Sequence, residues 1–277
     1  MTMPRIPLGE VIETFINFLV TNFSFLTMAF TRIMESVISF MENTLMLLHP
    51  LLFIIAVSAL VFWLTRKKGL SIFALAGLLL IWNMQLWEAT VSTITLVLIA
   101  TLTALIIGIP IGIVAALSHR VNRVVQPVLD VMQTMPAFVY LIPAIPFFGL
   151  GKVAAIFATV IFSMPPAIRL TCLGIQQVPE DLVECADAFG STKWQKLFKL
   201  QLPMATPTIM AGVNQTVMLA LSMVVIAAMI GARGLGGEVW RAIQRLQMGS
   251  GFEAGIAIVI VAIILDRVLQ HLGSKKQ

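Results

Sequence analysis

The side chains best suited to chemistry are charged and gathered in one stretch, residues 179–203, between two long apolar runs. The stretch holds four carboxylates and three amines, those of Glu180, Asp181, Glu184, Asp187, Lys193, Lys196 and Lys199. No paired-carboxylate or Ser/His/Asp constellation for catalysis is recognisable in the sequence. A charge at mid-bilayer costs a few kcal/mol or more, so this stretch must lie in water. The chemistry that it suits is noncovalent docking to a partner.

Two short helices that meet at a corner are predicted to position these charges. Pro179 suits a first helical position, and Gly190 supplies a stop. A second helix begins at Thr192 or the residue before it, and Gln195 completes a capping box with Thr192. Pro203 closes the segment before the next apolar run. Two interpretations follow: a solvated loop with some helicity, or a rigid wedge that fits a partner's groove.

The spacing within this stretch resembles the EAA loop of ABC importer permeases. Their pattern is Glu-Ala-Ala, three residues, Gly, nine residues, Ile, one residue and Leu-Pro, and in that family the loop is the coupling helix that docks on the ATPase subunit. The matching residues here are Glu184, Cys185, Ala186, Gly190, Leu200, Leu202 and Pro203. Cys185 stands for the usual alanine and Leu200 for the usual isoleucine, and both keep a small or aliphatic side chain.

Further motifs extend the resemblance to the glycine betaine/proline betaine permeases over roughly residues 88–270. They are residues 130–143, 188–191, 201–205 and 214–228. The resemblance implies a type I ABC importer with two permease copies, two ATP-binding subunits and an extracellular substrate-binding protein. It also implies that ATP and magnesium bind to the partner ATPase, that this chain binds no cofactor, and that the importer takes up glycine betaine or a related quaternary-ammonium solute for osmoprotection of a prokaryotic cell.

The composition is typical of a membrane protein. The chain has 277 residues, of which 59% are hydrophobic and 11% charged, whereas a soluble domain carries about 25% charged residues. The net charge of +5 does not indicate nucleic-acid binding, because Lys and Arg gather on the cytoplasmic side of membrane proteins. Cys172 and Cys185 fall in or beside the segment expected in the cytoplasm, so no structural disulfide is predicted. They show no metal-ligand spacing, and the histidines are scattered.

ATP hydrolysis by this chain itself is not expected, because the sequence lacks a phosphate-binding loop. Gly151 and Lys152 are followed by Val153 rather than by Ser or Thr, and Pro146 stands where the first glycine of the motif would be. The chain is therefore predicted to be a transport subunit and not an enzyme.

An all-α polytopic fold with about seven spans is predicted from runs of roughly 20 apolar residues. The spans are residues 45–65, 70–87, 89–117, 124–148, 153–174, 204–231 and 252–270. The positive-inside rule places the N-terminus outside and the C-terminus inside. The residues that fall inside under this rule are Arg66, Lys67, Lys68, Arg120, Arg123, Lys275 and Lys276. Arg233, Arg241 and Arg245 fall outside, where short basic loops are disfavoured, and the hypothesis is that they face a partner's carboxylates.

The chain divides into three predicted regions. Residues 1–43 form an N-terminal segment, residues 44–87 form two peripheral spans, and residues 88–277 form the permease core with the coupling loop. The apolar residues of the N-terminal segment are striped, which favours amphipathic helices in the membrane interface in contact with lipid. Residues 14–31 carry no charge and form an alternative span.

Prolines within the spans are candidates for the translocation path. The fourth span has three prolines within eleven residues, Pro136, Pro143 and Pro146, which remove backbone donors and force kinks. Freed carbonyls in lipid need protein or a water-lined path beside them. Pro165 and Pro166 are expected to break the fifth span likewise. The alternative is ordinary kinked packing.

Polar and aromatic residues complete the candidate path. The polar residues of the sixth span are expected to bond across helices, and the alternative is that they line the path. They are Asn214, Gln215, Thr216 and Ser222. Aromatic faces attract a quaternary ammonium group. The main aromatic cage is expected on the binding protein, and Phe138 and Tyr140 are further candidates for solute contact along the path. The full set of path and gate candidates is Met135, Pro136, Phe138, Tyr140, Pro143, Pro165, Asn214 and Ser222. The glycine-rich residues 231–237 are expected to form a flexible outer turn.

Other functions stay open. Within the fold, the runner-up is a permease for another small solute such as choline, carnitine or an amino acid, because the resemblance, and not the spans, determines the solute. An ion-gradient-driven carrier belongs to a different class, in which inverted repeats and charges in mid-membrane are usual. A membrane scaffold without transport would not explain three prolines in one span. Co-purification of a P-loop ATPase would distinguish these functions.

Overall fold

The structure is a computed structural model that describes residues 7–274, and every regular element in that range is helical. Lys275 and Lys276, expected on the inner side, lie outside the described residues. The elements in the first half are α1 (Leu8–Asn22), α2 (Ser24–Leu47), α3 (Pro50–Thr65), α4 (Lys68–Asn83), α5 (Trp87–Leu117), α6 (His119–Thr134), η1 (Ala137–Tyr140) and α7 (Leu141–Phe148). Those in the second half are α8 (Lys152–Gln176), α9 (Glu180–Ala188), α10 (Lys193–Lys196), η2 (Leu197–Gln201), α11 (Leu202–Ala227), η3 (Ala228–Ile230), α12 (Leu235–Gln244) and α13 (Met248–Ser274).

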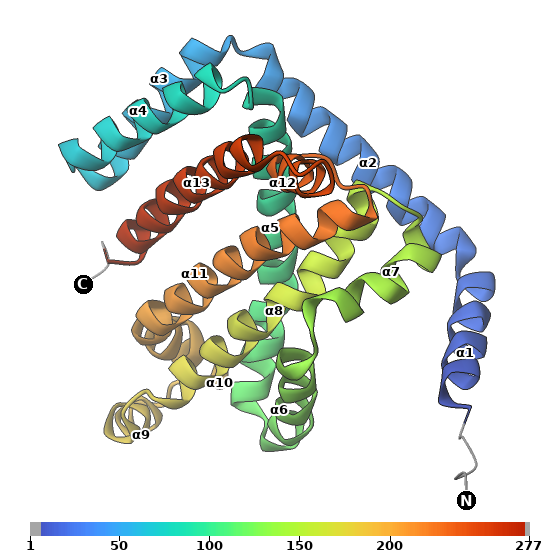
Figure 1. The fold of residues 1–277 in the computed structure, drawn as a ribbon. Coiled ribbons are helices and arrows are strands. Elements are labelled where there is room, and N and C mark those ends of the chain that lie inside the picture. Colours follow the sequence, from blue (N-terminus) through green and yellow to red (C-terminus); the bar gives the residue numbers. More distant parts are fainter. Residues whose placement is uncertain (1–6, 275–277) are drawn as a thin grey trace, which may run out of the picture.

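The core is a bundle of α5, α8 and α11, which pack closely through glycine. A Cβ atom at Gly112 of α5 would lie 2.6 Å from the carbonyl oxygen of Ile168 in α8, and one at Gly212 of α11 would lie 3.1 Å from that of Pro166. Small residues let helix backbones approach in this way. Since Gly174 near the end of α8 meets Ala205 near the start of α11, these two helices run in opposite directions. One end of the bundle therefore carries the α9–α10 segment, and the other carries α12 (Figure 1).

Four helical stretches are long and apolar enough to cross a membrane. They are Trp87–Leu117, Lys152–Gln176, Lys193–Ile230 and Met248–His271, and they correspond to four of the predicted spans. Two bent helix pairs raise the number to six if each pair is one span. α3 and α4 have only 16 residues each, which gives a length of about 24 Å against about 30 Å of hydrocarbon. The number of spans and their orientation stay predictions.

The span predicted over residues 124–148 is bent, as its prolines indicate. α6 and the following η1–α7 segment form an angle of 110°. The break falls at Met135, whose extended conformation (φ −71°, ψ 133°) is the one that a following proline favours. Pro136 therefore ends α6, whereas Pro143 and Pro146 lie within α7 without breaking it.

The predicted break of the fifth span at Pro165 and Pro166 is wrong, because α8 continues through both residues for 25 residues in all. Both prolines are buried, and the carbonyl of Pro166 faces Gly212 of α11. Neighbouring helices thus hold α8 in place although two backbone donors are missing, as membrane helices tolerate.

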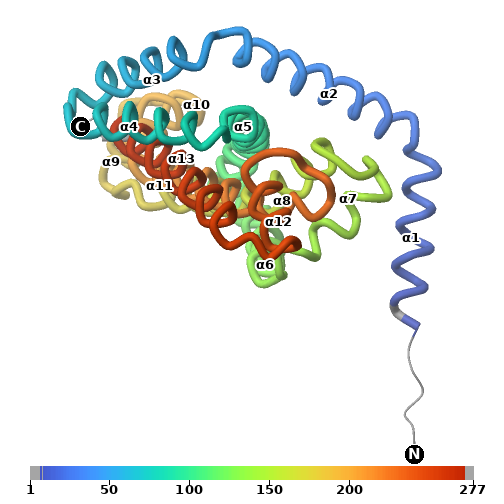
Figure 2. The backbone as a smooth tube through the Cα atoms, turned by 45° about the horizontal axis from the view of Figure 1, so that its top comes forward, coloured from blue at the N-terminus to red at the C-terminus, as the bar shows by residue number. Residues whose placement is uncertain are grey.

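The N-terminal helices α1 and α2 form an angle of 72° and are together long and apolar enough for one span. α2 packs against α5, α7 and α8, and α1 lies at the edge of the molecule beside α7 (Figure 2). The expected boundary at residue 43 falls inside α2, which continues to Leu47. Whether residues 1–43 lie on the membrane or cross it stays a prediction.

An ion pair joins the C-terminal part of α2 to the start of α8. The Nζ atom of Lys152, the first residue of α8, lies 2.5 Å and 2.6 Å from the two carboxylate oxygens of Glu42. Both side chains are largely buried, with exposed fractions of 24% for Lys152 and 14% for Glu42. The two residues are 110 positions apart in the chain, so their pairing ties the N-terminal helices to the core.

The flexible outer turn expected over the glycine-rich residues 231–237 is only partly a turn, because α12 begins at Leu235. Thr93 of α5 accepts a hydrogen bond from the Leu235 backbone N–H at 2.8 Å, and Ser92 donates one to the Arg233 carbonyl at 3.3 Å. The turn is therefore short and held on the beginning of α5.

Candidate functional site

The charged stretch forms an elbow of two helices, which we name the elbow (residues 179–201). α9 carries Glu180 and Asp181 in its first turn, where carboxylates stabilise the positive end of the helix dipole. Gly190 follows α9 with φ +74°. The N–H of Ser191 donates to the Ala186 carbonyl at 3.0 Å and that of Gly190 to the Asp187 carbonyl at 2.9 Å. This pair of bonds is a Schellman motif, so the predicted stop at Gly190 is confirmed.

The second helix of the elbow begins as the sequence predicts. The Thr192 hydroxyl accepts a hydrogen bond from the Gln195 N–H at 3.3 Å, and the Gln195 side chain accepts one from the Thr192 N–H at 2.8 Å. These reciprocal bonds are the expected capping box. An ion pair joins the two helices, because Nζ of Lys196 lies 2.7 Å from both carboxylate oxygens of Asp187. The spacing of charged residues in the sequence does not predict the Lys196–Asp187 ion pair.

The elbow does not end before the next span, and this corrects the sequence prediction. α10 continues through the π-helical turn η2 into α11, which makes one helical stretch from Lys193 to Ile230 of 38 residues. Leu202 and Pro203 lie at the start of α11, directly after the π-helical turn η2. A continuous helix of this length spans about 57 Å, so displacement of the elbow moves α11 directly.

Apolar side chains of the elbow point away from the rest of the chain. Phe189, Trp194 and Phe198 are exposed by 86%, 67% and 60%, and the rings of Trp194 and Phe198 stack with centroids 5.9 Å apart. α9 has no buried residue, whereas Leu197 is buried beside Ile175 and Ala205 and anchors the elbow. The exposed rings form an apolar surface next to the charges.

The motif residues lie along the elbow and at the start of α11. Glu184, Cys185 and Gly190 are exposed on α9 and its turn, and Ala186 is half-buried. The remaining three lie where η2 passes into α11: Leu200 and Leu202 are half-buried, and Pro203 is exposed. The structure thus brings all seven onto one outer segment of the molecule, shown beside α9 and α10 in Figure 1. Their contact with an ATPase stays a prediction.

Five candidates for the translocation path precede α8, and Tyr140 among them contacts neighbouring helices. The Tyr140 hydroxyl donates to the carbonyl of Met132 in the last turn of α6, and its ring meets Phe162 of α8 edge-on at 5.8 Å. Phe138 is 52% exposed. Pro136 is also exposed, while Met135 and Pro143 are half-buried. A role of Phe138 or Tyr140 in solute contact stays a prediction.

The expected bonds across helices are not formed by the sixth span. Thr216 donates to the Gly212 carbonyl and Ser222 to the Met218 carbonyl, both within α11. Asn214 has a buried Oδ1 atom without a hydrogen-bond partner among the described residues, and Ser222 is exposed. In α8, Pro165 is buried. Asn214 is the candidate whose polar group this chain leaves unpaired.

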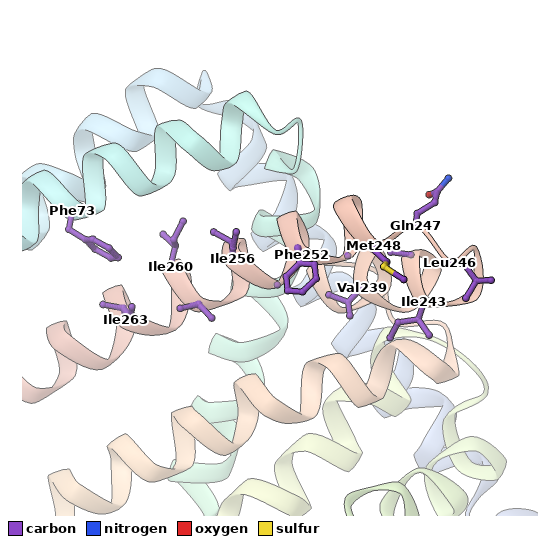
Figure 3. Close-up of a pocket in the computed structure, with 14 residues that line it drawn as sticks. Phe73, Val239, Ile243, Leu246, Gln247, Met248, Phe252, Ile256, Ile260 and Ile263 are labelled. Carbon is purple, nitrogen blue, oxygen red and sulfur yellow. The ribbon is translucent and has the colours of Figure 1, made fainter.

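An apolar groove lies between α4, α12 and α13 (Figure 3). It has a volume of about 820 Å³, and apolar residues such as Phe73, Phe252 and Ile256 line it, with Gln247 at its edge. A charged solute needs polar partners when it leaves water. The apolar lining offers few polar partners to a charged solute.

Comparison with known proteins identifies the family. The model of the family described as binding-protein-dependent transport system inner membrane component matches residues 108–276. The chain belongs to this family. It is a multi-pass membrane protein and a non-enzymatic transport subunit.

Two relatives that align over nearly their full length are named for the solute that they transport. This permease is 54% identical to the glycine betaine/carnitine transport permease protein GbuB of Listeria monocytogenes over 276 residues, 99% of this chain and 98% of the relative. It is 49% identical to the glycine betaine transport system permease protein OpuAB of Bacillus subtilis, over 99% of this chain and 97% of the relative. Identity to the ProW permease of Escherichia coli is 52% over 79% of this chain and 62% of that protein.

Solved structures agree with the fold. An inward-facing structure of the MetNI methionine ABC transporter matches this permease with a TM-score of 0.59, over 69% of this chain and 93% of that one, at 21% sequence identity. The fold class is therefore the all-α transmembrane domain of a type I ABC importer.

Proposed function

We propose that this permease forms the membrane passage of an ATP-driven importer of glycine betaine or a related quaternary-ammonium solute, which serves osmoprotection. The elbow supports the proposed coupling to an ATPase, because the rings of Phe189, Trp194 and Phe198 are exposed and available to pack against a partner. The names of the full-length relatives support the choice of solute. The partners are two ATP-binding subunits that hold ATP and magnesium, an extracellular binding protein, and a second copy of the permease.

The mechanism follows from the continuity of the elbow with α11. ATP draws the two ATPase subunits together, and each carries a groove that holds one elbow. The Lys196–Asp187 ion pair and the capping box keep the elbow rigid, so movement of the groove is passed to α11. α11 packs along α8 and α5, and displacement of α11 against them switches access to the passage from the inside to the outside.

Uptake into vesicles tests this function. We expect vesicles that contain the permease, its ATPase and its binding protein to accumulate labelled glycine betaine only when ATP is supplied to the ATPase side. Unlabelled choline, carnitine and proline betaine compete in proportion to their affinity, which ranks the solutes. The name of the 54% identical relative, a glycine betaine/carnitine permease, adds carnitine as a second candidate. Accumulation by the permease alone on a sodium or proton gradient would refute the proposal.

A further inference from the structure

Helix α6 is attached to the bundle by few side chains. Of its 16 residues, all within the described part of the chain, only Leu129 is buried. Two polar contacts with α8 add to that anchor. The side-chain oxygen of Asn122 lies 3.7 Å from Sγ of Cys172, and Oδ1 of Asp130 accepts a hydrogen bond from Nη2 of Arg169 at 2.5 Å. Since α8 is buried along most of its length, α6 is the more weakly held of the two helices.

The two sides of the bend after α6 rest on one face of α8. On the far side of the bend, the ring of Tyr140 packs edge-on against Phe162 at 5.8 Å. On the near side, Asp130 pairs with Arg169. Phe162 and Arg169 are seven residues apart, which places them on the same side of α8, about 10 Å from each other along the helix. α8 therefore holds the bend at one aromatic contact and at one ionic contact.

The ionic contact is the one that can open. The side chains of Asp130 and Arg169 are 66% and 35% exposed, whereas Tyr140 is buried. One hydrogen bond joins the pair, and Nε of Arg169 is buried without a hydrogen-bond partner among the described residues. A bidentate pair would be stronger and more specific in geometry. Because exposed ion pairs contribute little to stability, α6 can leave α8 at Asp130 while Tyr140 keeps the bend in place.

The arginine of this pair lies where a membrane helix seldom has a charge. Arg169 is the one charged residue between Lys152 and Gln176, in a helix long and apolar enough to cross a membrane. It is seven residues from the end of α8, a distance of about 10 Å. Charged residues within membrane spans are costly, and most of them are functional. A static contact between α6 and α8 would need no charges, so the pair indicates a contact that forms and breaks.

The pair also lies close to the helix that the elbow moves. Pro166 is three residues before Arg169 in α8, and its carbonyl oxygen is 3.1 Å from the position of a Cβ atom at Gly212 of α11. α6 and the elbow lie toward the same end of the bundle (Figure 1). Displacement of α11 by the elbow therefore reaches the turn of α8 that carries Arg169.

We propose that the Asp130–Arg169 pair is a latch, which holds α6 on α8 in this structure and opens in each transport cycle as α6 swings about Met135 and Pro136. The extended backbone of Met135 and the bend of 110° supply the hinge. The proposal rests on the proposed function, because movement of the elbow drives the opening. The alternative is a static ion pair, which predicts that a covalent link between the two positions has no effect on transport.

Cross-linking across the latch tests the proposal. Asp130→Cys and Arg169→Cys are combined in a permease in which Cys185 is replaced by alanine, the residue usual at that position of the motif. This permease is reconstituted in vesicles with its ATPase and binding protein. A short bis-methanethiosulfonate reagent then joins the two introduced cysteines, and a reductant separates them. We expect the bridge to abolish most of the ATP-driven uptake of labelled glycine betaine and the reductant to restore it.

The matched control joins α2 to α8 instead. Glu42→Cys and Lys152→Cys replace the other ion pair of α8 in the same permease, at a contact where the proposal has no movement. The same reagent should bridge these two cysteines and leave uptake at the level of the reduced sample.

A charge series tests the latch without cysteines. D130N and R169Q each remove the ion pair and should raise the ATPase rate measured without binding protein about threefold, because an exposed ion pair contributes a small free energy. R169D places two carboxylates together and should raise the rate further, whereas the exchange D130R/R169D restores the attraction and should return the rate toward that of the wild type. A merely structural pair would change the melting temperature without this pattern of rates.

The outcomes separate the latch from the proposed function. Uptake that persists while the cysteines at positions 130 and 169 are bridged would overturn the latch alone. If the cysteine variant is inactive even when reduced, the charge series decides, and wild-type rates in all of its variants would overturn the latch. An absence of ATP-driven uptake by the wild type would overturn the proposed function and the latch together.

Discussion

Removal of one exposed ring from the elbow should weaken attachment of the ATPase without harm to the fold. Phe189 is 86% exposed and lies at the C-cap of α9 with φ −81° and ψ 9°, which alanine adopts readily. Full burial of a phenylalanine side chain contributes about 1.5–3 kcal/mol. Phe189→Ala therefore removes this contribution from the complex alone, and a loss of about 2 kcal/mol corresponds to about 30-fold in Kd.

The assay is dissociation of the ATPase subunit from permease held in nanodiscs, followed by biolayer interferometry. Phe25→Ala in α2 is the matched control, because Phe25 is 83% exposed and lies far from the elbow in sequence and structure. We expect the control to bind with the wild-type Kd. Equal Kd values for wild type and Phe189→Ala would refute the reasoning that this ring is buried by the ATPase.

Three further predictions concern packing, the elbow and topology. Gly112→Ala should lower the melting temperature of the permease in detergent by several degrees, because its Cβ would lie 2.6 Å from the Ile168 carbonyl oxygen. In the control Gly255→Ala, the added Cβ would have no atom within 4 Å, and the melting temperature should stay unchanged. Equal melting temperatures for the two variants would contradict the close approach of α5 and α8. Gly190→Ala should reduce ATP-driven uptake more than Gly190→Asn, since φ +74° costs alanine about 1–2 kcal/mol and asparagine less; equal uptake by the two variants would argue against the Schellman turn. A cysteine in place of Leu246, which is 85% exposed, should react with an impermeant thiol reagent from outside the cell, and reaction only in inverted vesicles would reverse the proposed orientation.

The local features of the elbow were predictable from the sequence because neighbours in the chain determine them. The capping box needs only Thr192 and Gln195 at the right spacing, and the stop needs only a glycine that adopts positive φ. The bend at Pro136 was likewise signalled by three prolines, although its angle of 110° was not. Apolar length located the four long spans.

Features that depend on packing were beyond the sequence pattern. Pro165 and Pro166 carry the same local signal as Pro136, yet α8 continues, because α5 and α11 hold both sides of that helix. The Glu42–Lys152 pair joins residues 110 positions apart, and no periodicity indicates it. The hydroxyl of Ser222 could bond its own helix or another, and only the structure shows that it bonds Met218.

Cross-linking through a native thiol tests the central claim, that the elbow meets an ATPase. Cys185 is exposed on α9 and Cys172 is buried in α8, so a short thiol-to-amine cross-linker reacts with the first and leaves the second as an internal control. In membranes that contain the assembled transporter, we expect a product of permease and ATPase subunit that depends on Cys185 and is absent in Cys185→Ser. A Cys185 that reacts freely with a small maleimide but never links to the ATPase, with or without nucleotide, would contradict the account.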